Sequence, residues 1–147
     1  MKNLIALLFV SLFHSATPAW FTDMEKAKAE ASSHHELILL NFSGSDWCIP
    51  CIRLHKEIFE SSTFTAYAAD HLVLVNADFP RLKKNQLPKD QSARNDAMAD
   101  QYNAKGTFPL TLLMTPDGKI VKQWQGMPDE SPEKFVEEIQ SIANAGS

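Results

Sequence analysis

The sequence contains few cysteines and lacks several features that would point to a specialised architecture. Only two of its 147 residues are cysteine, no segment repeats, no low-complexity stretch is present, and basic residues are not in excess. The lack of repeats excludes repeat architectures, and the formal net charge of −4 argues against nucleic acid as a partner. The remaining composition, 44% hydrophobic and 22% charged, is typical of one globular domain with a sizeable core.

Residues 1–19 have the pattern of a cleavable signal peptide. Lys2 supplies a positive charge, and the apolar stretch 4–13 is of signal-peptide length, too short to span a bilayer comfortably. Small residues up to Ala19 predict cleavage after that position, which would leave a mature domain at 20–147 that works outside the cytosol, in the periplasm. An uncleaved membrane anchor is the alternative that this stretch leaves open.

The two cysteines form one Cys48-Ile49-Pro50-Cys51 motif. A largely apolar run at 37–42 precedes it and predicts a buried strand, and residues 52–59 predict a helix. A Cys-x-x-Cys that opens a helix after a strand is typical of redox motifs. The helix N-terminus favours a thiolate at Cys48, and Cys51 lies one turn on, close enough to close a small disulfide. A structural disulfide is the alternative, but so short a loop gains little chain entropy.

The rest of the chain predicts alternating helices and strands. Helices are expected at 23–31, 63–70, 92–102 and 131–142, and strands at 37–42, 72–78, 110–114 and 120–124. Pro116-Asp117-Gly118 predicts a hairpin between the last two strands. The basic residues of the polar loop 81–90 are interpreted as solvated surface. This order predicts an α/β fold in which a mixed central β-sheet has helices on both faces.

Three features in chain order carry a family resemblance: Trp47 before the first cysteine, the Cys-x-x-Cys motif, and Pro109 before the hairpin. With them the sequence resembles the thioredoxin superfamily over nearly all of the mature chain. Within it, the sequence is similar to the exported bacterial thiol–disulfide oxidoreductases, in particular the DsbH-like reductases. The resemblance implies a thioredoxin fold, a cis peptide bond between Phe108 and Pro109 near the cysteines, and disulfide exchange as the activity. Trp47, Phe108 and Pro109 would then face the substrate.

The sequence departs from this family beneath the second cysteine. Thioredoxins keep an aspartate on the central strand there, where it can move the proton of that thiol. Asn41 is the nearest residue in this chain, and an amide cannot act as a base. The resemblance therefore assigns no proton acceptor to Cys51.

Disulfide exchange requires an attacking thiol and a sheltered thiol that resolves the mixed disulfide. Cys48, at the exposed helix end, is predicted to be the nucleophile and Cys51 the resolving thiol, with no cofactor. Ile49 and Pro50 offer no charge that would stabilise a thiolate, and Asp46 opposes ionisation, so the pair is predicted to be reducing. The expected partners are disulfide-containing exported proteins and a DsbD-like membrane electron donor, and the chain is expected to be a monomer.

Three other functions stay open at this point. One is a disulfide oxidase or isomerase of the same fold, against which the uncharged Ile49-Pro50 pair argues. Another is a copper or zinc metallochaperone that uses Cys48, Cys51 and His55, since a helix could bring His55 to the same side. Three ligands on one helix without a fourth give poor support for a metal, so no metal site is assigned. The third is a redox-inactive binding module on the same scaffold.

Overall fold

The computed structural model describes residues 17–146. The predicted signal peptide at 1–19 therefore lies outside the described residues, except for 17–19. Among residues 17–146, no helix combines the length and the apolar character needed to cross a membrane.

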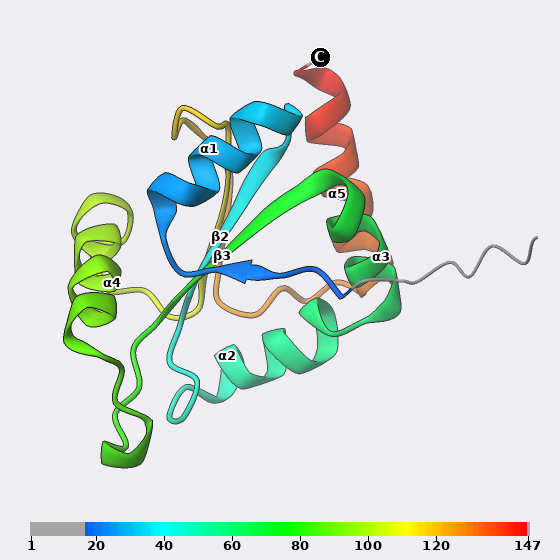
Figure 1. The fold of residues 1–147 in the computed structure, drawn as a ribbon. Helices are drawn as coiled ribbons and strands as arrows, with labels where there is room; N and C mark the ends of the chain where they lie inside the picture. The colour runs from blue at the N-terminus through cyan, green and yellow to red at the C-terminus, as the bar shows by residue number, and fades with distance from the viewer. Residues whose placement is uncertain (1–16, 147) are drawn as a thin grey trace, which may run out of the picture.

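A five-stranded mixed sheet forms the centre of the molecule (Figure 1), with the strand order β1-β3-β2-β4-β5. Its strands are β1 (Trp20–Phe21), β2 (Leu37–Ser43), β3 (Leu72–Asp78), β4 (Leu110–Met114) and β5 (Ile120–Gln125). β2 pairs in parallel with β3 and antiparallel with β4, and β4 pairs antiparallel with β5 as the predicted hairpin. The apolar runs of β2 and β3 are buried on both faces, as expected for strands inside a sheet that is covered on both sides.

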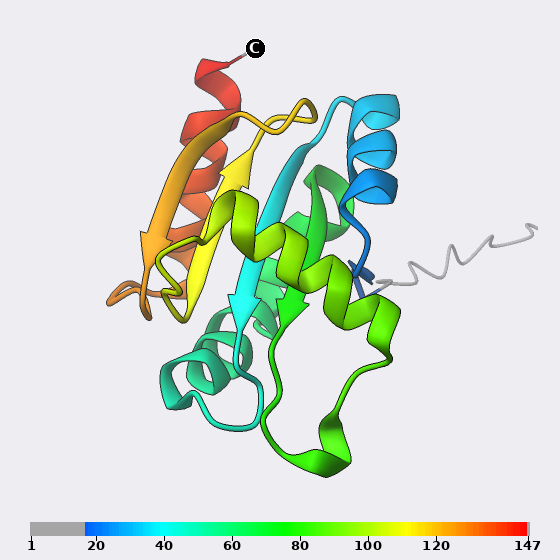
Figure 2. The ribbon, with the colours of Figure 1, turned by 90° about the vertical axis from the view of Figure 1, so that its left-hand side faces the viewer.

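Helices cover both faces of this sheet (Figure 2). The helices are α1 (Met24–His34), α2 (Ile49–Leu54), α3 (Ser62–His71), α4 (Lys89–Tyr102) and α5 (Pro132–Ala145). Alternate side chains of β2 enter different cores, because successive residues of a strand point to opposite faces. Leu40 packs with residues of α1 and α4, whereas Leu39 packs with residues of α2, α3 and α5. The predicted α/β architecture, with helices on both faces, is confirmed.

Local signals in the sequence explain where these helices begin. The side chains of Asp23, Ser61 and Ser131 each accept backbone N–H groups of the first turn of α1, α3 and α5. Pro132 occupies the first turn of α5, where its missing N–H costs no hydrogen bond. The side chains of Phe135 and Ile139 on α5 are fully buried against the sheet.

Three features differ from the sequence-based expectation. The two-residue strand β1 was not predicted, and it pairs in parallel with β3 at Trp20. The helix that begins after Cys48 continues beyond α2 as a π-helical segment, His55–Phe59, rather than as a regular α-helix. The polar loop is shorter than predicted because α4 already starts at Lys89, and it contains a 3-10 turn at Lys83–Asn85.

Candidate active site

The cysteine pair lies where β2 ends and α2 begins. Cys48 is the N-cap of α2, and its Sγ accepts the backbone N–H of Cys51 at 3.3 Å. The backbone N–H of Cys48 donates to the carbonyl of Gly44 at 2.9 Å, which closes the turn after the strand. The two sulfur atoms form a disulfide, with the Cα atoms 5.2 Å apart. The sequence-predicted placement of both cysteines around a helix N-terminus is confirmed.

The expectation that Cys48 lies at an exposed helix end is wrong in this disulfide form. Cys48 is 5% exposed and Cys51 is 2% exposed, so exposure barely distinguishes the two. What distinguishes the cysteines is their hydrogen bonding, because the Sγ of Cys48 faces an N–H of the first helical turn.

Trp47 connects the cysteine turn to two other segments. Its indole Nε1–H donates to the carbonyl of Phe79 at 2.8 Å. The edge of its ring meets Phe108, with the ring centroids 5.5 Å apart. The guanidinium of Arg81 lies 3.5 Å from the indole centroid, a cation–π contact. The peptide bond between Phe108 and Pro109 is cis, as the resemblance implied.

These aromatic residues border a depression of about 650 Å³ beside the cysteine turn. The predicted substrate-facing residues Trp47 and Phe108 both line it. Pro109, the third of them, does not line it and is buried.

The segment after β3 is fixed against the cysteine turn by Asp46, whose carboxylate accepts three hydrogen bonds. The donors are the backbone N–H groups of Arg81 and Leu82, both at 2.9 Å, and the side-chain amide of Asn85 at 3.0 Å. The N–H of Arg81 makes the largest contribution to lowering the pKa of the Asp46 carboxyl, followed by Asn85 and Leu82. Asp46 therefore holds this loop against the cysteine turn.

Asn41 lies buried on the central strand, and its amide is satisfied by neutral partners. Its Nδ2–H donates to Asn76 and its Oδ1 accepts the hydroxyl of Thr111, both at 3.1 Å. Neither amide nor hydroxyl can take a proton from a thiol at neutral pH. Asn76 and Cys51 also line one cavity of about 340 Å³.

His55 lines the same cavity as Cys51, together with Glu60. Its Nε2 lies 3.3 Å from the Glu60 carboxylate, and its side chain is 56% exposed. Within residues 17–146, no three His, Cys, Asp or Glu side chains are grouped so that they could hold a metal ion. The Cys48, Cys51 and His55 set of the metallochaperone alternative is thus not assembled as a ligand set.

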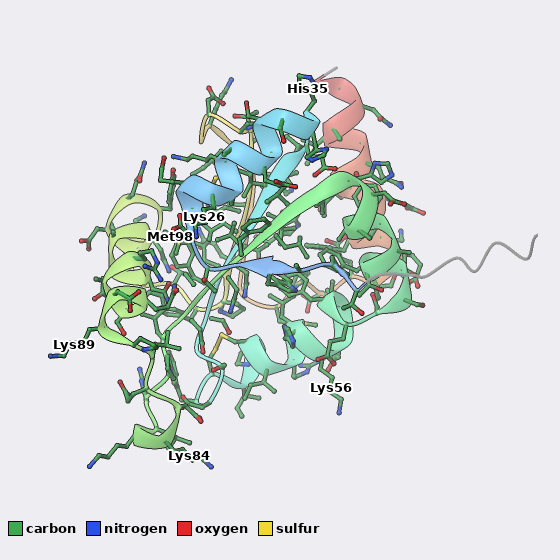
Figure 3. All side chains as sticks on the ribbon, viewed as in Figure 1. Lys26, His35, Lys56, Lys84, Lys89 and Met98 are labelled. Atoms are coloured by element: carbon green, nitrogen blue, oxygen red, sulfur yellow. A yellow bond between two sulfur atoms is a disulfide. The ribbon has the colours of Figure 1, made fainter. Side chains whose placement is uncertain are left out.

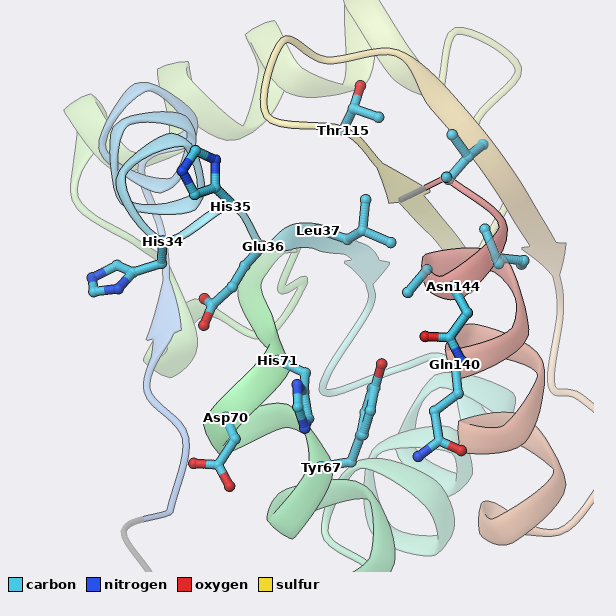
Figure 4. Close-up of a pocket in the computed structure, with 14 residues that line it drawn as sticks. His34, His35, Glu36, Leu37, Tyr67, Asp70, His71, Thr115, Gln140 and Asn144 are labelled. Atoms are coloured by element: carbon cyan, nitrogen blue, oxygen red, sulfur yellow. The ribbon is translucent and has the colours of Figure 1, made fainter.

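A larger cavity, of about 730 Å³, lies at the opposite end of the sheet from the cysteines (Figure 4). His34 and His35 come from the C-terminal end of α1 and His71 from that of α3, and the ring of His71 stacks on Tyr67 with centroids 4.7 Å apart. In Figure 4 the side chain of His34 points away from Tyr67 and His71. These histidines do not converge on one point, and none of the predicted site residues lies here.

Sequence reasoning missed two residues of the cysteine surroundings. Arg81 was interpreted as solvated surface, although its guanidinium covers Trp47. Asp46 was considered only as a charge near Cys48, although it binds a segment 35 residues away in sequence. No local signal could have found either contact, because both depend on how the loops after β2 and β3 meet.

Comparison with known proteins finds a matching family and several relatives. The model of a thioredoxin-like domain family matches residues 24–143. The disulfide bond reductase DsbH of Chlamydia pneumoniae is 40% identical over 95 residues, which cover 62% of this chain and 55% of that protein. The thioredoxin-related protein DsbJ of Chlamydia pneumoniae is 22% identical over 128 residues, 87% of this chain and 36% of that protein.

Among solved structures, that of a DsbH oxidoreductase superposes with a TM-score of 0.79 at 29% identity. That superposition covers 97% of this chain and 95% of the solved chain. The chain spans about half the length or less of the two curated relatives.

Proposed function

This chain belongs to the thioredoxin-like domain family and has the thioredoxin fold, and from that premise we propose that it is a disulfide reductase of exported proteins. The observation that carries the proposal is the hydrogen bond from the N–H of Cys51 to the Sγ of Cys48 at the start of α2. In the reduced protein the same N–H and the helix dipole would stabilise a Cys48 thiolate, which is the reactive species in exchange. The relationship to a disulfide bond reductase supports the same activity.

The reaction that we propose has two exchange steps. The Cys48 thiolate attacks one sulfur of a substrate disulfide, the substrate S–S bond breaks, and the released substrate thiolate takes a proton. Cys51 then loses its proton and attacks the Sγ of Cys48, which forms the Cys48–Cys51 disulfide and frees the second substrate thiolate. Two electrons pass from the protein dithiol to the substrate. A dithiol donor must return them, and a DsbD-like membrane protein is the proposed source.

The surroundings of the cysteines support the reducing direction. Ile49, between the cysteines, is 66% exposed and carries no charge or hydrogen-bond donor in its side chain. Beyond the helix N-terminus, therefore, the Cys-x-x-Cys motif offers little that would stabilise the thiolate. A less stabilised thiolate leaves the disulfide form comparatively favoured, so the dithiol gives up its electrons more readily.

Export to the periplasm is part of the proposal. It is supported by the signal-peptide pattern of residues 1–19 and by the relationship to Dsb proteins. Strand β1 begins at Trp20, so cleavage after Ala19 would remove no residue of the sheet. Mass spectrometry of the native protein should find a mature chain that begins near Trp20. An intact Met1 in the membrane fraction would contradict this part of the proposal.

Insulin reduction tests the activity itself. With a dithiol reductant present, the protein should accelerate the reduction of insulin disulfides, and the Cys48→Ser variant should not. It should do little to oxidise a reduced, unfolded substrate. Fast oxidation of that substrate together with no acceleration of insulin reduction would move the protein to the oxidase class.

A further inference from the structure

The loop between β3 and α4 places a group of positive charges beside the cysteine turn. Its residues 79–86, here called the basic loop, include Arg81, Lys83 and Lys84 and no acidic residue, in a chain whose formal net charge is −4. All three basic residues are exposed. In both Figure 1 and Figure 2 this loop runs side by side with the turn that leads into α2. Figure 3 shows Lys84 projecting from the tip of the loop toward solvent.

The basic loop is held in a defined position rather than only tethered at its ends. Asp46 binds the N–H groups of Arg81 and Leu82 and the side chain of Asn85. Asp78, where the loop starts, accepts both the N–H and the hydroxyl of Ser45 on the cysteine turn, at 2.9 and 2.6 Å. These bonds join the loop to the segment that carries Cys48, so its charges keep a fixed relation to the disulfide.

A depression with an aromatic lining lies directly beside these charges. Trp47 of the cysteine turn lines it, together with Gly106 and Phe108 of the segment before the cis-proline. The start of the basic loop, Phe79, Pro80 and Arg81, completes the lining. Arg81 is the only charged residue among these described lining residues. Asp46, on the cysteine turn, accepts three hydrogen bonds from the basic loop. At the edge of the depression itself, the one charged group among the described residues is thus the guanidinium of Arg81.

We propose that the basic loop selects protein substrates that carry acidic side chains next to the disulfide to be reduced. A peptide segment that presents its disulfide to Cys48 would lay the neighbouring residues along this depression, where Arg81 favours carboxylates, and toward Lys83 and Lys84 farther along the same loop. Such charge complementarity acts mainly on the rate of association and on the choice of partner. The inference rests on the proposed reductase function, and it adds the substrate class to it.

The test uses two synthetic peptides, each with one internal disulfide. They are identical except that the residues flanking one cysteine are glutamate in the first and glutamine in the second. The reduced protein is mixed with an excess of either peptide, the reaction is quenched with acid, and mass spectrometry follows the formation of the Cys48–Cys51 disulfide. We expect the acidic peptide to react about tenfold faster at low salt, a typical gain from electrostatic steering.

Two controls separate the basic loop from general electrostatics. The R81Q/K83Q/K84Q variant should lose most of the preference for the acidic peptide, whereas K26Q/K119Q/K134Q, which removes the same charge elsewhere, should keep it. The preference should also fall when the ionic strength rises from about 0.01 M to about 1 M, where the Debye length shrinks from about 30 Å to about 3 Å.

The outcomes distinguish this inference from the function on which it rests. If the reduced protein reacts with neither peptide disulfide, the reductase function is wrong and the inference falls with it. If both disulfides are reduced at equal rates, or if the two triple variants behave alike, the reductase function stands and the substrate class is wrong.

Discussion

Replacing Gly44 by alanine should disturb the active site through a steric clash with Trp47. A Cβ atom at position 44 would lie 2.3 Å from Cε2 and 2.7 Å from Nε1 of the Trp47 indole. Carbon atoms in favourable contact are about 3.5–4.0 Å apart, so the indole would have to move by more than about 1 Å. The indole has little freedom to move, because its N–H donates a hydrogen bond to the carbonyl of Phe79 and its face is covered by the guanidinium of Arg81.

The expected cost follows from these contacts. Overpacking of a filled site costs about 1–3 kcal/mol, and loss of the indole hydrogen bond to Phe79 adds about 1 kcal/mol. The Gly44→Ala variant should therefore unfold with a free energy about 2–4 kcal/mol below that of the wild-type protein. Because the displaced ring precedes Cys48 directly, the rate of insulin reduction should fall as well.

Urea unfolding followed by circular dichroism measures this effect, and tryptophan fluorescence of the native state reports the movement of the ring. Gly146→Ala is the matched control, because a Cβ there has no neighbour nearer than 3.8 Å and should change stability by less than about 0.5 kcal/mol. If Gly44→Ala matched this control in stability and kept the native fluorescence, the described packing of Trp47 would be wrong.

Three further predictions concern the cysteines, the buried amide and the loop contact. Cys51→Ser should accumulate mixed disulfides with substrate, because Cys48 can still attack but nothing resolves the product. Cys48→Ser should form none. Mass spectrometry of the trapped complexes checks this, and mixed disulfides on Cys48→Ser but not on Cys51→Ser would contradict it. Asn41 is only 4% exposed, so Asn41→Asp would bury a carboxyl, and desolvation would raise its folded pKa above the unfolded value of about 3.9. The variant should therefore lose little stability relative to the wild type at about pH 3.5, and the loss should grow as pH rises through the folded pKa. Urea unfolding of both proteins at about pH 3.5 and pH 8 checks this. An equal loss of unfolding free energy at the two pH values would contradict it. Asp46 has a lowered folded pKa, so its stabilisation of the loop is present above the unfolded value of about 3.9 and lost as pH falls through the folded pKa. Hydrogen-exchange protection of the amides at 81 and 82 should then fall in acid in the wild-type protein but not in Asp46→Asn, and identical pH profiles would refute the assigned role.

Strong local signals made most of the fold predictable. The apolar runs of β2 and β3 predicted strands that are buried on both faces, and Ser131 with Pro132 predicted the start of α5. The placement of Cys48 at the start of a helix followed from the strand, turn and helix pattern around the motif. Each of these features depends on residues that are close together in the sequence.

The features that sequence reasoning missed depend on contacts between distant segments. Strand β1 has two residues, too few for any periodic pattern, and exists through its pairing with β3. The position of Arg81 over Trp47 results from docking of the basic loop, in which Asp46 binds residues 35 and 36 positions away. A pattern of residue types carries no information about such a contact until the fold brings the two loops together.

The equilibrium reduction potential of the Cys48–Cys51 pair tests the proposed direction most directly. Equilibration of the purified protein with dithiothreitol buffers of graded potential, followed by alkylation and mass spectrometry, gives the fraction of each form. A reductase of this design should have a potential near the ~−270 mV of thioredoxin, because little beyond the helix N-terminus stabilises the Cys48 thiolate. A potential near the ~−120 mV of DsbA would contradict the account, since the disulfide of a pair whose reduced form is so strongly stabilised would accept electrons from substrates.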